Sequence, residues 1–294
     1  MSTRSTSYTR AGLTFDVVDS GPIDGPVVVA LHGFPQTASS LTDFTELLNA
    51  RGYRTLAPNQ RGYSPGARPR GRLAYRIPEL VEDVVALIRE IDRGPVHLVG
   101  HDWGAMVAWS LAAARPDLVR TLVTVSVPHP AAFRAAMVSS DQLARSYYMG
   151  LFQFPVLPER LLSARPQLLD RVLAGTGMSA EAIGRVHREI VDTGALPGAL
   201  NWYRAIPLLG QRAISAPVRV PVTHVWSTGD SALNRRGAEL TGKYVTGDYR
   251  LVVLDGASHW VPEERPHELA DIVAERIESV RVRPGSADRE GQRP

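Results

Sequence analysis

Residues 95–114 carry the feature that most constrains the fold of this chain. A short, largely apolar run at 96–99 predicts a buried strand, and an alanine-rich stretch without glycine or proline after Gly104 predicts a helix. Between them, Gly-His-Asp-Trp-Gly at 100–104 has the spacing of the nucleophile elbow Gly-x-Ser-x-Gly, with aspartate in place of serine. Such a turn is tight and strained, so glycine is needed on both sides of its apex, where side chains would collide.

Asp102 occupies the apex of this turn, beside the N-terminus of the predicted helix. Free backbone N–H groups and the helix dipole favour an anion at that position. We therefore expect its carboxylate to be ionised and able to act as a nucleophile. Taken alone, the motif fits equally well an ordinary strand–turn–helix with incidental glycines.

The composition narrows the class of protein. Of 294 residues, 44% are hydrophobic and 21% are charged, as in soluble globular proteins. No apolar run approaches the roughly 18 residues of a membrane span. The start of the chain lacks the apolar core of a signal peptide, so we expect a cytoplasmic enzyme with no membrane partner. With no cysteine, disulfide and thiol chemistry are excluded.

The positive charge does not indicate a nucleic-acid partner. The net charge is +3 and the pI is near 9.4, and among 33 basic residues only Lys243 is a lysine. The arginines are scattered, often beside Asp, Glu or Pro, and they form no dense basic run. No nucleic acid is therefore expected among the partners.

Strand and helix patterns alternate along most of the chain. We expect a hairpin at 8–19, strands at 27–31, 54–58, 96–99, 120–127, 220–226 and 249–254, and helices at 38–51, from Pro78, after Gly104 and at 266–280. This alternation predicts an α/β protein with a mostly parallel, doubly wound sheet. Helical stripes and prolines interrupt it after the strand at 120–127. We expect a core domain at 1–130 and 218–282, a helical cap at 131–217 and a disordered tail at 283–294.

Four loops that follow strands end in groups capable of chemistry, and such loops gather at one edge of a parallel sheet. They contain His-Gly-Phe-Pro at 32–35, Asp102, Asp230 and His259. The order nucleophile, acid, histidine is the one expected of an elbow of this kind. His259 would deprotonate a water, and Asp230 would hold its imidazole in the right tautomer. The backbone N–H groups of Phe34 and Trp103 would hold the negative oxygen of a tetrahedral intermediate.

The remaining histidines and acids are expected to have structural rather than catalytic roles, with a few exceptions. We expect His32 to bond nearby backbone, and His97, His101, His187, His224 and His267 to be packing or surface residues. His129, which follows a strand, is the rival of note among the histidines. Asp248 and Asp255 are rivals to Asp230, although neither follows a strand end at the expected place.

Taken together, these segments resemble the α/β-hydrolase superfamily, and within it the epoxide hydrolases and their haloalkane dehalogenase relatives. The resemblance rests on residues 32–35 and 100–104, on Trp-x-x-Gly-Asp ending at Asp230 and on Gly-x-x-His ending at His259, and it covers about 8–280. It implies an α/β-hydrolase fold with an inserted helical cap. A nucleophilic carboxylate suits displacement at a saturated carbon, so the implied intermediate is an alkyl ester of Asp102 that water later cleaves.

Two segments of the expected cap favour epoxides. An epoxide leaves as an alkoxide, which needs an acid, and two phenols can supply it. The sequences Ser-Tyr-Tyr-Met-Gly-Leu-Phe-Gln-Phe-Pro at 146–155 and Leu-Asn-Trp-Tyr-Arg at 200–204 are similar to the cap segments that carry the two tyrosines of epoxide hydrolases. The resemblance thus implies Tyr148 and Tyr203. Tyr147 is adjacent but lies about 100° away on a helix, so it cannot face the same pocket. Without the family, each tyrosine would be read as an interfacial aromatic.

A haloalkane dehalogenase is the alternative function. In many of those enzymes a polar Asn or Glu follows His-Gly and helps to hold the halide, whereas this chain has Phe34, although Trp103 could still supply an indole donor. Fluoroacetate dehalogenases carry an arginine directly after the nucleophile, which Trp103 does not match. A non-catalytic, ligand-binding relative is a third interpretation, which the complete triad disfavours.

The expected pocket is largely apolar. Its candidate lining residues are Phe34, Trp103, Phe133, Met149, Phe154 and Trp202. The expected partners are a small apolar epoxide and water, with a homodimer left open. The implied chemistry needs no cofactor and no metal, so neither is expected.

Overall fold

One sheet organises the residues described by the computed structural model, 4–208 and 216–281. Its eight strands lie in the order β1-β2-β4-β3-β5-β6-β7-β8. Their bounds are β1 Ser7–Arg10, β2 Leu13–Ser20, β3 Val27–Leu31, β4 Arg54–Pro58, β5 Val96–His101, β6 Val119–Val125, β7 Val222–Ser227 and β8 Tyr249–Leu254. β2 pairs antiparallel with β1 and β4, and the other pairs are parallel. The predicted α/β class with a mostly parallel sheet is confirmed. The predicted disordered tail at 283–294 lies outside the described residues.

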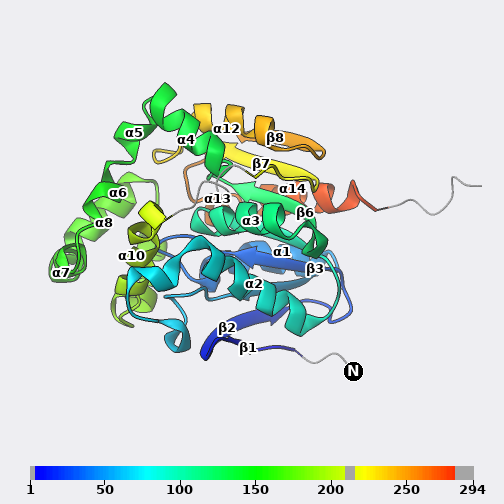
Figure 1. Cartoon of the computed structure of the whole chain (residues 1–294), viewed down its shortest axis with the longest axis horizontal. Helices are drawn as coiled ribbons and strands as arrows, with labels where there is room; N and C mark the ends of the chain where they lie inside the picture. The colour runs from blue at the N-terminus through cyan, green and yellow to red at the C-terminus, as the bar shows by residue number, and fades with distance from the viewer. Residues whose placement is uncertain (1–3, 209–215, 282–294) are drawn as a thin grey trace, which may run out of the picture.

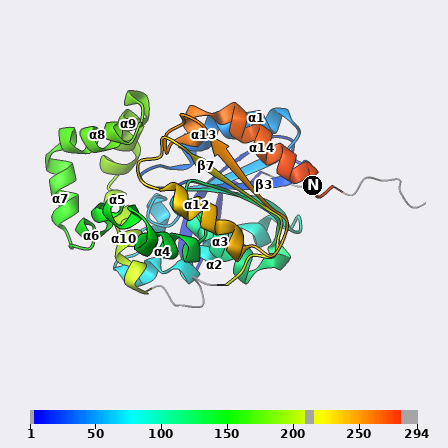
Figure 2. The ribbon, with the colours of Figure 1, turned by 90° about the horizontal axis from the view of Figure 1, so that it is seen from above.

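Helices cover both faces of this sheet. Figure 2 shows α1 (Thr42–Ala50), α13 (Val261–Glu264) and α14 (Pro266–Glu278) on one side, and α2 (Ile77–Ile91), α3 (Trp103–Ala114) and α12 (Arg235–Thr241) on the other. Side chains of β3 alternate between two cores: Val28 and Ala30 pack with the α1 and α14 cluster, and Val29 and Leu31 with the α2 and α3 cluster. A strand buried on both faces explains why residues 27–31 are apolar without interruption.

The strand boundaries differ from the predicted ones where local backbone chemistry intervenes. β5 continues to His101 because Gly100 and His101 still pair with β6. β6 ends at Val125, before the predicted 127, because Ser126 has a φ of 67°, which an extended strand cannot contain. β7 begins at Val222 rather than 220, after Pro221, which has no N–H to donate. The strands at 27–31, 54–58 and 249–254 have the predicted bounds.

Between β6 and β7 the regular elements of residues 130–208 are all helical. They are α4 Pro130–Ser139, α5 Gln142–Arg145, α6 Tyr147–Leu151, α7 Leu157–Ala164, α8 Pro166–Gly175, α9 Ala180–Val186, the π-helix His187–Val191, α10 Leu196–Arg204 and the 3-10 turn Ile206–Leu208. Both views show α5 to α8 and α10 gathered beyond one end of the sheet (Figure 1, Figure 2). Other 3-10 turns are Ala38–Leu41, Pro65–Ala67, Arg72–Tyr75, Pro116–Leu118 and Gly242–Tyr244. Among the described residues, no helix has the length and apolar character needed to cross a membrane.

Candidate active site

Asp102 sits in a strained turn between the end of β5 and the start of α3. Its φ of 50° and ψ of −120° lie in a region that L residues rarely adopt. A Cβ on Gly100 would lie 2.4 Å from the carbonyl oxygen of Gly104, and one on Gly104 would lie 2.3 Å from that of Leu31. Both distances are impossible, so the collision predicted for the two flanking positions is confirmed, and the turn can form only with glycine there.

The loop after β3 lies directly against the Asp102 side chain. The backbone N–H of Phe34 donates to Oδ1 of Asp102 at 2.7 Å. A Cβ on Gly33 would lie 2.3 Å from Cβ of Asp102, so the close approach depends on that glycine. Trp103 is the first residue of α3, where backbone N–H groups have no partner within the helix. Of the two expected backbone donors, Phe34 thus contacts the carboxylate, and Trp103 directly follows Asp102 at the start of α3.

Asp230 and His259 lie next to Asp102, although they are far apart in the sequence. Nδ1 of His259 lies 2.8 Å from Oδ2 of Asp230, and Nε2 lies 3.6 Å from Oδ2 of Asp102. The other oxygen of Asp230 accepts from the N–H groups of Ala232 and Leu233 at 2.8 and 2.9 Å. The carboxylate of Asp230 is thereby held in one orientation, and His259 bridges the two acids.

The buried acids and the imidazole form an ion-paired site. Burial acts to raise the pKa of Asp102 and of Asp230, but the neighbouring His259 outweighs it and holds both below their ordinary range. Burial alone would lower the pKa of His259, yet the charges of Asp230 and Asp102 raise it to about 10. At neutral pH, Asp102 is therefore a carboxylate beside a protonated imidazole.

Two side chains that sequence reasoning did not assign to the site hold the loop of His259. Nε2 of His101 lies 2.9 Å from the backbone carbonyl oxygen of His259, and the Ser126 hydroxyl donates to the same oxygen at 3.2 Å. Burial lowers the pKa of His101 to about 4, so its ring is neutral and can donate one N–H to that oxygen. The only sequence signal was position: each residue ends a strand or directly follows one.

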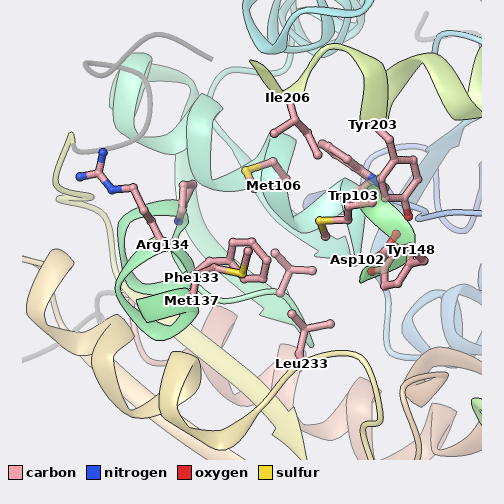
Figure 3. Close-up of a pocket in the computed structure, with 13 residues that line it drawn as sticks. Asp102, Trp103, Met106, Phe133, Arg134, Met137, Tyr148, Tyr203, Ile206 and Leu233 are labelled. Atoms are coloured by element: carbon pink, nitrogen blue, oxygen red, sulfur yellow. The ribbon is translucent and has the colours of Figure 1, made fainter. Parts of the chain in front are cut away.

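A cavity of about 280 Å³ opens above Asp102 (Figure 3). Tyr148 from α6 and Tyr203 from α10 line it together with Asp102. The ring centroids of the two tyrosines lie 5.9 Å apart. Burial raises the pKa of both phenols, so both keep their protons at neutral pH. Tyr147 is 68% exposed and faces away from this cavity.

Three of the predicted pocket residues line the cavity: Trp103, Phe133 and Met149. Phe34 lies beside it, with its ring 5.1 Å from that of Tyr203. Phe154 and Trp202, also predicted for the pocket, do not line this cavity. Phe154 follows the end of α6 and is 55% exposed. Trp202 is next to Tyr203 on α10, so it points about 100° away, into the core, where its indole donates to the carbonyl of Arg61 at 2.8 Å.

Sequence reasoning missed several lining residues. They are Met106, Val127, Pro130, Arg134, Met137, Ile206 and Leu233. With Phe133, three of them form one stripe of α4, at 130, 133, 134 and 137, the spacing of a single helix face. Met106 lies one helical turn after Asp102. Given Phe133 and Asp102 as site residues, the helical spacing of their neighbours could have predicted these additional lining residues.

The rival residues have structural partners elsewhere. His129 caps α4 by accepting from the N–H of Ala131, and Asp248 pairs with Arg276. Asp255 accepts from the hydroxyl of Thr228, on the exposed side of the loop. His32 contacts the carbonyl of Gly33 and accepts from the N–H of Gln60, as predicted. Within residues 4–208 and 216–281, no cluster of three or more His, Asp or Glu side chains could hold a metal ion.

Comparison with known proteins matches residues 26–266 to a family model described as the alpha/beta hydrolase fold. The AB hydrolase superfamily protein YfhM of Bacillus subtilis is 32% identical over 276 residues, covering 91% of this chain and 96% of that protein. Epoxide hydrolase 3 of Xenopus tropicalis is 33% identical over 279 residues, covering 90% of this chain and 74% of that protein. The crystal structure of epoxide hydrolase A from Mycobacterium thermoresistibile superposes with a TM-score of 0.80 at 28% identity, covering 92% of this chain and 97% of that one.

Proposed function

Since the chain belongs to the α/β-hydrolase fold family, and within it to the epoxide hydrolases, we propose that it opens an epoxide to a vicinal diol through a covalent ester on Asp102. The observation that carries the proposal is the shared cavity. An ionised carboxylate and two protonated phenols, those of Tyr148 and Tyr203, line it together. A nucleophile facing paired acids is what ring opening of an epoxide requires.

In the first step, an oxygen of Asp102 attacks one ring carbon, and the bond from that carbon to the ring oxygen breaks. The electron pair goes to the ring oxygen, which takes a proton from Tyr148 or Tyr203. The other phenol hydrogen-bonds the same oxygen. Because both phenols keep their protons at neutral pH, either is available as the acid. The product is a hydroxyalkyl ester of Asp102 and one phenolate.

Ester formation changes the protonation of His259. The raised pKa of His259 depends on two carboxylates, and the ester removes the charge of Asp102. The pKa of His259 then falls, and its proton passes to the phenolate, which becomes a phenol again. The neutral imidazole, held at Nδ1 by Asp230 at 2.8 Å, then deprotonates a water that attacks the ester carbonyl carbon.

The tetrahedral intermediate of this second step carries a negative oxygen. The N–H of Phe34, already 2.7 Å from Oδ1 of Asp102, and the N–H of Trp103 at the start of α3 would hold it. When the intermediate collapses, the bond from the carboxyl carbon to the diol oxygen breaks. That oxygen takes the proton of the hydroxyl that water supplied, so the diol leaves and Asp102 is a carboxylate again. In this account, residues 131–217 act as a cap that brings the phenols to a core of 1–130 and 218–282.

The indole of Trp103 bears on the choice between epoxides and haloalkanes. Its ring lies 5.1 Å from that of Tyr203, so the donor that a halide would need packs against one of the proposed acids. The direct test compares a panel of epoxides with a panel of 1-haloalkanes, scored for diol and for halide release. We expect diol formation and little halide. Halide release at rates equal to or above epoxide opening would reverse this assignment.

A further inference from the structure

The proposed reacting groups lie at one end of the cavity rather than at its middle. Figure 3 shows Asp102, Tyr148 and Tyr203 together at one end, with Phe133 and Met137 further along and Arg134 at the opposite end. Arg134 is exposed, so the opposite end meets solvent. A substrate that enters from there must present its epoxide ring at its leading end.

Aromatic rings fill the space beyond the reacting groups. The ring of Phe152 lies 5.0 Å from that of Tyr203 and 5.7 Å from that of Tyr148. The ring of Phe34 lies 5.1 Å from that of Tyr203 and 5.7 Å from that of Phe152. Neither phenylalanine ring lines the cavity. These half-buried rings, which we call the aromatic plug, pack behind the two tyrosines and outside the cavity, so the cavity does not continue past the reacting groups in this direction.

We infer that the substrates are terminal epoxides, with a single apolar substituent that extends from the ring towards Arg134. This inference rests on the proposed function and adds the substitution pattern of the epoxide. Between the reacting groups and Arg134, the lining side chains are apolar, among them Met106, Phe133 and Leu233. Apolar walls favour an alkyl or aryl group over a polar one.

The cavity is small for a ligand site. Its volume of about 280 Å³ lies just below the roughly 300–1,000 Å³ of typical small-molecule pockets. A compact substituent is therefore expected.

Two isomers of formula C9H10O provide a matched test. In 4-methylstyrene oxide, the methyl group lies at the far end of the aryl ring and would point towards Arg134. In trans-β-methylstyrene oxide, the same methyl group is on the second epoxide carbon and would point into the aromatic plug. We expect kcat/KM for diol formation to be roughly 10- to 200-fold higher for the first isomer. That range is the usual effect of one misplaced methyl group in an apolar pocket.

Variants of two neighbouring phenylalanines separate the effect of the plug from intrinsic reactivity. Phe152→Ala should lower the ratio of the two kcat/KM values by about tenfold, because it opens space beside the second epoxide carbon. Phe154→Ala is the control, since that ring is 55% exposed, and it should leave the ratio unchanged. The chemical difference between the isomers is the same for every variant and cancels. Phe152→Leu, which keeps more packing volume, replaces Phe152→Ala where thermal unfolding shows that the alanine variant is not folded.

The outcomes are distinguishable. Absence of diol from either isomer and from the whole epoxide panel would refute the proposed function itself. Diol from both isomers at comparable kcat/KM would overturn the substrate inference and leave the function standing. A ratio that Phe152→Ala or Phe152→Leu leaves at the wild-type value would also overturn it, because the preference would then come from chemistry and not from the aromatic plug.

Discussion

Nδ1 of His259 lies 2.8 Å from Oδ2 of Asp230, and this contact turns the opposite nitrogen of the ring towards Asp102. The other oxygen of Asp230 is held by two backbone N–H groups, so the acid cannot rotate away. The imidazole thus has one available nitrogen, and that nitrogen faces the proposed nucleophile at 3.6 Å. This arrangement suits a base that acts after Asp102 has become an ester, and it leads to the first prediction.

His259→Gln should let the ester form but not be hydrolysed. Alkylation needs the carboxylate of Asp102 and the phenols, whereas hydrolysis needs the base. Intact-mass analysis of this variant after mixing with an epoxide should show an adduct equal to the mass of the epoxide. Peptide mapping should locate that adduct at Asp102.

The origin of the added oxygen provides the matching check on the wild-type protein. Excess enzyme reacting once in ¹⁸O-labelled water should give mostly unlabelled diol, with the label left on Asp102, because the first oxygen comes from the carboxylate. Repeated turnovers should then give labelled diol. Fully labelled diol in the single turnover, with no adduct on His259→Gln, would mean that water attacks the epoxide directly and that Asp102 is a general base.

Removing either proposed acid should slow formation of the ester. We expect Tyr148→Phe and Tyr203→Phe each to reduce the alkylation rate by about 10²- to 10⁴-fold, the usual contribution of a positioned acid, and the double variant to have almost no activity. Stopped-flow measurement of single turnovers separates this step from hydrolysis. Tyr147→Phe is the control, because Tyr147 is 68% exposed. Greater damage from Tyr147→Phe would show that the acid has been assigned to the wrong neighbour.

The ion-paired site should stabilise the fold most strongly in mildly acidic solution. The pKa of His259 is raised from 6.5 to about 10 in the folded protein, so its stabilising contribution is complete below pH 6.5 and is lost as the pH rises towards 10. The pKa values of Asp102 and Asp230 lie below 3.8, so their contribution is present above that pH and is lost on further acidification. The melting temperature of the wild type, minus that of His259→Gln, should therefore be greatest between about pH 4 and 6.5 and should fall by pH 10. A difference that stays constant over this range would contradict the ion-paired state.

Arg204 connects the segments that carry the two phenols. Its guanidinium donates to both oxygens of Glu159 at 2.6 and 2.8 Å and to the backbone carbonyls of Phe152 and Phe154 at 3.1 and 2.8 Å. Because Arg204 directly follows Tyr203 and Phe152 closes α6 after Tyr148, these bonds set the spacing of the two tyrosines.

Replacing Arg204 should therefore affect both stability and the acid-assisted step. Arg204→Met should lower the free energy of unfolding by about 3 kcal/mol, because a largely buried partner loses its counter-charge. Arg204→Lys keeps the charge but not the fork of donors, so it should slow alkylation more than ester hydrolysis in single-turnover experiments. Arg235→Met, which removes an exposed pair with Glu239, should change stability by less than about 1 kcal/mol. Equal slowing of both steps by Arg204→Lys would indicate a general loss of structure instead.

Local sequence determined the elements and the turn that carries the proposed nucleophile. Apolar runs such as 27–31 are typical of strands buried on both faces. The glycines at 100 and 104 allow a backbone approach that any other residue would prevent. These features depend on neighbours in the chain, which is why they could be predicted without coordinates. Two strand ends differ from the predicted ones, at Ser126 and Pro221. Each has a local cause, a positive φ at Ser126 and a missing N–H at Pro221. Whether such a residue ends the strand depends on how the strand pairs with its neighbour.

Only the tertiary structure decided which side chains share a space. Trp202 and Tyr203 are adjacent in the sequence, yet one packs in the core and the other lines the cavity, because the orientation of α10 sets which face meets Asp102. Phe154 is exposed and Phe152 lies in the aromatic plug for the same kind of reason. The clamp of His101 and Ser126 on the carbonyl of His259 joins three strands or loops that are distant in the chain. Such contacts result from packing among separate elements, and no periodicity within a single element encodes them.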